Sequence, residues 1–349
     1  MINVGLAGIG FMGWIHWLAY QKVPGIRVTA IASQSPKKRA GDWRSIQGNF
    51  GPPGEQVDLT GIKTSKNIDQ LLDDPNIDMV DITLPPALHT DVALKALKAG
   101  KHVFCEKPLA LTTADCQKMI RAAQRADRMI LVGHVLPFFP EYKWALKAIE
   151  SGKFGKLKGG SFRRVISDPS WLKNYWSAKH VGGPMLDLHV HDTHFIRLAC
   201  GEPTAVTTRG RMRKNLAEFW HSFLEFKDRN LVVETTSGTT PQQGRAFEHG
   251  FEIHLEQATL MFNFAVIGGE GKYMCPPTLL NNRGKALEPK LAGGDPLESF
   301  QAEIREVAKS IKTGQVSEVL DAALARDAIV LCQKQTESME KNRRVTIGH

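Results

Sequence analysis

The strongest indication of the fold of this 349-residue chain is a glycine motif near its start, Gly8-Ile9-Gly10-Phe11-Met12-Gly13. It follows a short apolar run, Asn3–Ala7, and precedes an apolar helical pattern that begins at Trp14. A G-x-G-x-x-G between a strand and a helix is typical of a dinucleotide-binding βαβ unit. In such units the first glycine makes the tight turn, the second lets the backbone approach a pyrophosphate, and the third lets the helix pack closely on the strand. We therefore expect a phosphate cradle formed by Gly8, Gly10, Phe11, Met12 and Gly13.

The first third of the chain alternates short apolar runs with amphipathic helical patterns, which is typical of βαβ units. Helical patterns cover Pro86–Ala99 and Thr112–Ala126. The expected strands are Asn3–Ala7, Val28–Ala32, Met79–Thr83, His102–Phe104 and Met129–Val132. These elements predict an α/β Rossmann domain with a doubly wound parallel sheet over residues 1–133.

From about residue 157 the hydrophobic period changes to two, which predicts strands. The remainder, residues 134–349, is expected to form an α+β domain with one large, mostly antiparallel sheet. Helices are expected at about 141–151, 184–199, 297–313 and 317–341. Residues 268–295 are rich in Gly and Pro and predict an irregular loop. The expected strands are Lys158–Val165, Thr204–Arg211, Glu218–Phe226, Leu231–Thr236, Phe247–Glu256 and Thr259–Phe264.

Composition and charge exclude several classes of protein. Charged residues interrupt every apolar run before the roughly 18 residues that a membrane helix needs, and the first residues lack the features of a secretory signal. The five cysteines are widely spaced without a C-x-x-C pair, which favours a reducing compartment. The net charge of +9 comes from scattered cations without a recognition module. We expect a cytoplasmic protein without a nucleic-acid or membrane partner.

Ser33 stands about 20 residues beyond Gly13, where the dinucleotide fingerprint has an acid that binds ribose hydroxyls. A carboxylate there would repel a 2′-phosphate, whereas the Ser33 hydroxyl and the nearby cations Lys37, Lys38 and Arg39 can bind one. The cofactor prediction is therefore NADP rather than NAD. The alternative is that these cations form only the solvated first turn of the next helix.

Two later segments carry further motifs: Glu106-Lys107-Pro108, and Gly182-Gly183-Pro184-Met185-Leu186-Asp187-Leu188-His189-Val190-His191-Asp192. Together with the glycine motif and Asp321-Ala322-Ala323, they resemble the Gfo/Idh/MocA family of NAD(P)-dependent oxidoreductases over nearly the whole chain. The resemblance implies a Rossmann domain followed by a domain with an open-faced sheet, and a substrate bound between that sheet and the nicotinamide. It also implies Lys107, Asp187 and His191 as the catalytic group, with Glu106 and Lys107 beside the cofactor.

The chemistry of these side chains supports that assignment. In a helix that begins at Pro184, Asp187 and His191 lie one turn apart on one stripe. Oxidation of a carbinol needs a base for the hydroxyl proton, and the imidazole of His191 suits that role. Lys107 would hold the same oxygen, and Asp187 would orient the substrate or His191. The alternatives are a purely structural trio and a metal site, which we do not favour because His189 points away from the stripe.

The substrate contacts are expected near Gly182, where aromatic and basic side chains cluster. Aromatic faces beside hydrogen-bonding groups suit a sugar or polyol, although such aromatics can equally pack a core. The arginine that many relatives carry near Pro137 is absent, so no substrate contact is taken from those relatives. The candidate substrate residues are Lys107, Arg163, Trp171, Tyr175, Trp176, Asp187 and His191.

Three functions fit these residues. The first is an NAD(P)-dependent oxidoreductase that transfers hydride between nicotinamide and a carbinol or ketone carbon of a sugar, inositol or related cyclic polyol. The second is a glycosidase that uses a tightly bound dinucleotide in a transient oxidation and elimination. The third, a catalytically silent dinucleotide sensor, has no chemical need for Lys107, Asp187 and His191. We also expect a homodimer or homotetramer, because the large sheet needs a partner over its uncovered face.

Overall fold

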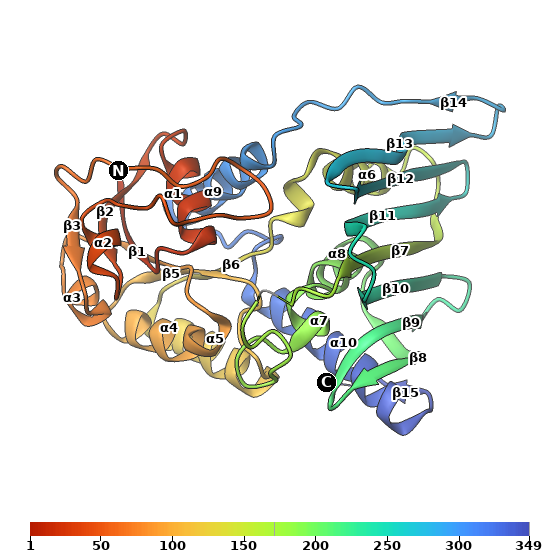
Figure 1. Cartoon of the computed structure of the whole chain (residues 1–349). Helices are drawn as coiled ribbons and strands as arrows, with labels where there is room; N and C mark the ends of the chain where they lie inside the picture. The colour runs from red at the N-terminus through yellow and green to blue at the C-terminus, as the bar shows by residue number, and fades with distance from the viewer. Residues whose placement is uncertain (171, 349) are drawn as a thin grey trace. The chain divides into compact units, whose positions relative to one another are not determined.

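The computed structural model describes residues 1–170 and 172–348, which form two compact units (Figure 1). Of the described residues, the first unit contains 1–139 and 293–326, and the second contains 140–170, 172–292 and 327–348. This division differs from the predicted boundary at residue 133, because residues 293–326 return to the first unit. Helix α9 (Pro296–Thr313) packs there, with Phe300, Ile304 and Val307 in the same apolar core as the glycine-loop helix α1 (Phe11–Tyr20).

The first unit is built on a six-stranded parallel sheet with the order β3-β2-β1-β4-β5-β6, as the alternating pattern predicted. Its strands are β1 (Ile2–Ala7), β2 (Ile26–Ala32), β3 (Lys63–Ser65), β4 (Met79–Ile82), β5 (His102–Glu106) and β6 (Ile130–Gly133). Its helices besides α1 and α9 are α2 (Pro36–Arg39), α3 (Ile68–Leu72), α4 (His89–Lys98) and α5 (Thr113–Ala126), with short 3₁₀ turns η1 (Pro86–Leu88) and η2 (Leu136–Phe138). Strand order reverses between β1 and β4, and ligands of such sheets bind at the carboxyl ends of the strands beside that point.

The second unit is built on a nine-stranded sheet with the order β14-β13-β12-β11-β7-β10-β9-β8-β15, in which only β7 and β10 are parallel. The predicted large, mostly antiparallel sheet is therefore confirmed. Its strands are β7 (Leu157–Ser167), β8 (Pro203–Arg213), β9 (Leu216–Phe226), β10 (Val232–Thr240), β11 (Arg245–Leu255), β12 (Ala258–Ile267), β13 (Glu270–Asn281), β14 (Ala286–Leu287) and β15 (Val345–Thr346). Its helices are α6 (Pro140–Glu150), α7 (Gly183–Asp187), α8 (Val190–Cys200) and α10 (Ala322–Lys341).

The helices α6, α8 and α10 contact one face of this sheet. Tyr142 of α6 bonds His249 of β11, Asp192 of α8 bonds Arg164 of β7, and α10 bonds β9 through Gln335. Arg164 and His249 are directly paired across β7 and β11, so their side chains lie on the same face. The neighbouring residue Arg163 points to the opposite face, since side chains alternate along a strand.

The expected irregular loop at residues 268–295 is wrong in its first half, which forms the twelve-residue strand β13 (Figure 1). The strand pairs with β12 over most of its length, and the register shifts between Met261 and Asn263. Pro276 and Pro277 lie opposite that shift, where the missing N–H groups cost no ladder bond.

None of the helices in residues 1–170 and 172–348 combines the length and the apolar character that a membrane span needs.

Candidate functional site

The glycine loop joins β1 to α1 in the geometry that a phosphate cradle requires. Gly8 has a φ of +103°, which favours glycine, and a Cβ on Gly13 would lie 2.2 Å from the carbonyl oxygen of Gly8. A Cβ on Gly10 would meet nothing within 4 Å, so the space in front of this residue is open. Gly10 caps α1 without a side-chain bond, which leaves the first N–H groups of a ten-residue helix for an anion. These residues fit the pyrophosphate of a dinucleotide.

The segment after β2 begins with Ser33 and carries three cations with different surroundings. The ammonium of Lys38 donates to the carbonyl of Ile9 inside the glycine loop, and burial lowers the pKa of Lys38. The guanidinium of Arg39 donates to the carbonyls of Ser33 (2.7 Å) and Gln34 (3.1 Å). Lys37 is exposed. The structure therefore brings Ser33, Arg39 and Lys38 beside the cradle and leaves Lys37 toward solvent.

Lys107 follows β5 directly and is half-buried. The preceding Glu106 is 5% exposed, and its Oε2 accepts the backbone N–H of Lys107 at 3.1 Å. Its other carboxylate oxygen, Oε1, lies 3.0 Å from Nε2 of His16 on α1. Glu106 therefore holds the peptide that carries Lys107, a role that its place in the motif did not indicate.

Asp187 is the last residue of α7, and His191 lies in the first turn of α8. The expected continuous helix from Pro184 to Ala199 is wrong at Leu188 and His189, which separate the two helices. The carbonyl of Pro184 accepts the N–H groups of both Leu188 (3.0 Å) and His189 (2.9 Å), which interrupts the regular pattern of one acceptor per donor. The backbone at both residues stays in the right-handed helical region, so the chain kinks there without unwinding.

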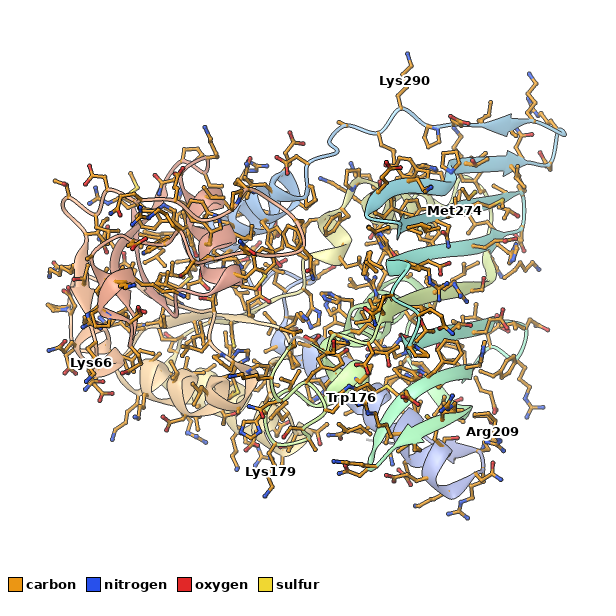
Figure 2. All side chains as sticks on the ribbon, in the orientation of Figure 1. Lys66, Trp176, Lys179, Arg209, Met274 and Lys290 are labelled. Atoms are coloured by element: carbon orange, nitrogen blue, oxygen red, sulfur yellow. The ribbon has the colours of Figure 1, made fainter. Side chains whose placement is uncertain are left out.

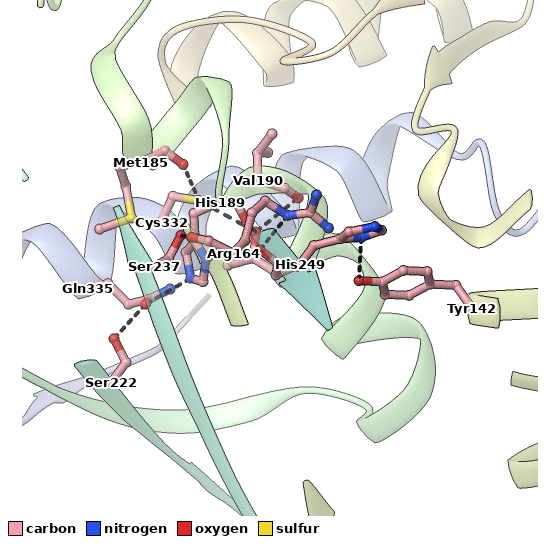
Figure 3. Close-up of polar contacts among 12 residues, drawn as sticks. Tyr142, Arg164, Met185, His189, Val190, Ser222, Ser237, His249, Cys332 and Gln335 are labelled. Atoms are coloured by element: carbon pink, nitrogen blue, oxygen red, sulfur yellow. Dashed lines mark hydrogen bonds and ion pairs between the residues drawn. The ribbon is translucent and has the colours of Figure 1, made fainter. Parts of the chain in front are cut away.

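The side chain of His189 lies at this break between α7 and α8, and Figure 3 shows its polar contacts. It is fully buried, its Nε2 lies 3.1 Å from Oε1 of Gln335, and its ring packs edge-on against Trp220. Gln335 also accepts the hydroxyl of Ser222 at 2.6 Å. His189 is thus anchored to α10 and β9, beneath the segment that carries the two candidate catalytic side chains.

A buried ion pair adjoins this anchor. Nε of Arg164 donates to Oδ2 of Asp192 at 2.9 Å, and both side chains are at most 4% exposed. Burial alone would raise the pKa of Asp192, but Arg164 and His189 outweigh it and hold this pKa below its usual value. Burial lowers the pKa of the neighbouring His249 to about 3, so that ring is neutral. The pair fixes the first turn of α8, in which His191 lies.

Three candidate substrate residues, Arg163, Tyr175 and Trp176, lie within the second unit and contact other residues there. Tyr175 is 1% exposed, and burial raises the pKa of its phenol well above the usual value. Trp176, labelled in Figure 2, donates its Nε1–H to Asp168 at 2.9 Å and lies under the guanidinium of Arg213. Arg163 bonds Glu248 on the sheet face opposite Arg164. Trp171 lies outside the described residues.

Within residues 1–170 and 172–348, no group of three or more His, Cys, Asp or Glu side chains could hold a metal. Three residues that belong to none of the sequence motifs, His16, Asp81 and His89, lie around Glu106 and Lys107 in the structure. A usable signal existed for two of them, because Asp81 interrupts the apolar run Met79–Ile82 and His16 interrupts the apolar run of α1. Ionisable groups in such runs are rarely buried unless they are paired.

Comparisons with known proteins agree with these features. A model described as "Oxidoreductase family, NAD-binding Rossmann fold" matches residues 2–134, and a "GFO/IDH/MocA C-terminal domain" model matches residues 142–261. The scyllo-inositol 2-dehydrogenase (NAD(+)) of Bacillus subtilis is 25% identical over 335 residues, which are 92% of this chain and 89% of that protein. The 2,7-anhydro-N-acetylneuraminate hydratase of Escherichia coli is 30% identical over 259 residues, 71% of this chain and 63% of that protein.

The fold matches that of a levoglucosan dehydrogenase solved in complex with NADH and levoglucosan, with a TM-score of 0.80, 24% identity and full coverage of both chains. Together, the two family models cover more than two thirds of the 349 residues. The glycine cradle, the Glu106-Lys107-Pro108 segment and the α7–α8 segment all fall inside the matched ranges. The chain belongs to the Gfo/Idh/MocA family of oxidoreductases with an NAD-binding Rossmann fold.

Proposed function

We propose that this protein is a nicotinamide-dependent dehydrogenase that acts on a CH–OH carbon of a sugar, inositol or related cyclic polyol. The observation that carries the proposal is the open glycine cradle, whose strand and helix meet the requirements of a dinucleotide site. Lys107 after β5 and the pair Asp187 and His191 across the α7–α8 kink supply the reactive groups. The named relatives act on inositol and on anhydrosugars, which supports this substrate class.

The residues have complementary roles in this proposal. When bound, the nicotinamide supplies the hydride acceptor. His191 takes the proton of the substrate hydroxyl as a general base. The ammonium of Lys107 donates a hydrogen bond to the same oxygen and stabilises it as the proton leaves. Asp187 orients the substrate or His191, and the buried Arg164–Asp192 pair keeps the first turn of α8 in place.

A rate assay tests the proposal with scyllo-inositol, myo-inositol and levoglucosan as probes and with NAD and NADP as cofactors. Positioned acid–base groups contribute about 10²–10⁴-fold, so we expect losses of that size from Lys107→Ala and His191→Ala, with little change in cofactor affinity. Asp187→Asn should cost less if Asp187 only orients its neighbours. Lys290→Ala, a change at an exposed residue between β14 and α9 (Figure 2), is a surface control. A fully active His191→Ala protein would remove the base assignment.

A second candidate is a redox-neutral reaction, in which the dinucleotide stays bound and is restored in each cycle. The relative named as a hydratase favours it, since the addition of water transfers no net electrons. The glycosidase expected as an alternative from the sequence belongs to this class. Release of sugar from a chromogenic glycoside, or conversion of an anhydrosugar, without a change in cofactor absorbance would support this candidate over a dehydrogenase.

For the cofactor, we propose a preference for NADP(H) over NAD(H). Ser33 carries no charge to repel a 2′-phosphate, and Lys38 and Arg39 lie beside the glycine loop and Ser33. Calorimetric titration should show tighter binding of NADPH than of NADH, and Ser33→Asp should reverse this order. Tighter binding of NADH by the unaltered protein would contradict the preference.

We also propose self-association through the sheet face opposite the helices of the second unit. Phe223 and Val232 lie on this face, because their neighbours Ser222 and Val233 point to the helices or are buried. They are 45% and 48% exposed, which is high for large apolar side chains. Light scattering should give a dimer or tetramer, and Phe223→Asp should shift it toward the monomer. A monomer at micromolar concentration would contradict the proposal.

A further inference from the structure

Two successive buried contacts hold the amino-terminal side of the peptide that carries Lys107. His16 on α1 contacts the carboxylate of Glu106 (3.0 Å), and Glu106 accepts the backbone N–H of Lys107 (3.1 Å). The other nitrogen of His16, Nδ1, lies 2.8 Å from Oδ2 of Asp81 on β4. Both ring nitrogens thus face carboxylate oxygens, and only the imidazolium form donates to both.

The surroundings of His16 explain why a charge is tolerated there. Burial opposes the charged ring, but Asp81 and Glu106 outweigh it and raise the pKa of His16 well above the usual value. The remaining groups that face this ring are Phe104 of β5 and Phe300 of α9, which pack on it, and Glu303 of α9. Burial, together with Glu106 and Asp81, raises the pKa of Glu303 well above the usual value, which favours its neutral form.

A second histidine holds the carboxyl-terminal side of the same peptide. His89 begins α4 and is fully buried. Its Nδ1 lies 2.9 Å from the carbonyl of Pro108, and its Nε2 lies 2.7 Å from the carbonyl of Leu84. Burial lowers the pKa of His89, so the neutral ring donates its one N–H to one of these carbonyls while it lies between the segments after β4 and β5.

We propose that His16 and His89 are positioning residues that hold Lys107 from both sides, and that His16 links its position to α1, the helix of the phosphate cradle. The inference rests on the proposed role of Lys107 in the reaction. Catalysis is sensitive to the placement of reacting groups, and a displacement of about 1 Å can cost about 10²-fold in rate. If this peptide is fixed, the ammonium of Lys107 keeps a constant position relative to a cofactor that α1 itself binds.

The first test needs no substrate. The amide of Lys107 donates to a carboxylate, so hydrogen exchange of the purified full chain should be at least about tenfold faster at this amide in His16→Gln. Exchange in β2 should be unchanged. Nitrogen-15 NMR of labelled histidine should show His16 protonated at both nitrogens at pH 7. A neutral ring, or unchanged exchange at Lys107, would overturn the inference.

The second test separates positioning from general damage. With the probe substrate that gives the highest rate, His16→Gln should lower kcat by about 10–100-fold with small changes in KM and in the dissociation constant of the dinucleotide. His89→Phe, which keeps a ring but removes its N–H donor, should show the same pattern. In a Lys107→Ala background, the further loss from His16→Gln should nearly vanish, since His16 acts through Lys107. Equal losses in both backgrounds would assign His16 a merely structural role.

Two variants protect the test against misfolding. Gly133→Ala deletes no buried charge, but its new Cβ would lie 3.1 Å from Oε1 of Glu106 and disturb the same link, so it should reproduce part of the kcat loss. Tyr20→Phe removes a bond to Asp81 and leaves the link from His16 to Glu106, so it is the matched control on α1. If Lys107→Ala keeps its rate, the proposed function fails. If Lys107→Ala is inactive and both His16→Gln and Gly133→Ala keep their rates, only this inference fails.

Discussion

The two units bury charge in different ways. In the second unit Arg164 is matched by Asp192, one cation for one carboxylate, and both are bonded. In the first unit His16 bridges Asp81 and Glu106, and Glu303 lies buried nearby with no hydrogen-bond partner for either carboxyl oxygen among the described residues. A buried acid without a cation is more stable as the neutral form. Changes in pH should therefore affect the buried charges of the first unit more than the Arg164–Asp192 pair of the second unit.

The largest change in the free energy of unfolding should come from removal of the buried cation of the second unit, Arg164. Arg164→Met leaves Asp192 buried without its guanidinium, and such losses typically cost about 3–5 kcal/mol. Arg163→Met is the matched control, because the adjacent Arg163 is 37% exposed and its partner Glu248 also bonds Arg245 and Asn263. We expect a cost of at most about 1 kcal/mol there. Urea unfolding measures both, and equal losses would contradict the distinction.

The polar anchor of His189 should give the next largest effect. Gln335→Leu removes the acceptor of both His189 and Ser222 at a fully buried site, where an unsatisfied polar group costs about 1–3 kcal/mol. Gln333→Leu, a change at a half-buried position of the same helix, controls for the substitution. Thermal unfolding should separate the two variants. A stable Gln335→Leu protein would show that the kink at His189 does not need this bond.

Replacement of Glu303, the buried acid without a cation in the first unit, should change the free energy of unfolding by less, and the change should depend on pH. Burial raises the pKa of Glu303, so the folded state keeps a proton that the unfolded chain releases above about pH 4.3. Stability is therefore lost as the pH rises from that value through the folded pKa. Glu303→Gln removes this loss. If Glu303→Gln raises the free energy of unfolding by about 1 kcal/mol at pH 8, its Tm should rise by about 2–4 °C at that pH, with no rise at pH 4.

The control for this prediction is Glu306→Gln, which removes a carboxylate from the half-buried face of the same helix beside Lys309. Melting curves of both variants between pH 4 and pH 8 make the comparison. The reverse trend, a Glu303→Gln advantage that grows as the pH falls, would show that Glu303 is ionised when buried.

The smallest effect should come from an exposed pair on the second sheet. Arg344 bonds Glu225 through two nitrogens at 2.8 and 2.9 Å, and the two side chains are 52% and 34% exposed. Exposed pairs contribute about 0–1 kcal/mol and are screened by salt. Arg344→Met should therefore change the free energy of unfolding by less than Arg164→Met, Gln335→Leu or Glu303→Gln, and the change should shrink in 1 M NaCl. If Arg344→Met lowered the free energy of unfolding as much as Arg164→Met does, burial would not explain the difference between the two ion pairs.

Much of the candidate site was predictable from the sequence, because its signals are local. The glycine spacing from Gly8 to Gly13 decides a turn and a helix start within six residues, and the structure has both. Lys107 directly after a short strand, and Asp187 and His191 four residues apart, were predicted as candidates from local spacing and from the family resemblance. The alternation of apolar runs likewise predicted the two sheets, because the side-chain period differs between helices and strands.

Contacts between distant segments decided the rest. β13 forms because β12 offers a paired edge, although its own Gly and Pro content favours a loop. His189, at the break between α7 and α8, contacts Gln335, 146 residues away in the chain. Glu106 turns inward because His16 meets it from α1, 90 residues away. Spacing in a sequence specifies which residues can share a turn or a face, whereas the partner of a buried polar group is set by which elements pack against it. The glycine cradle and the candidate groups could therefore be predicted from the residues alone, whereas the contacts that hold them depend on how distant elements pack.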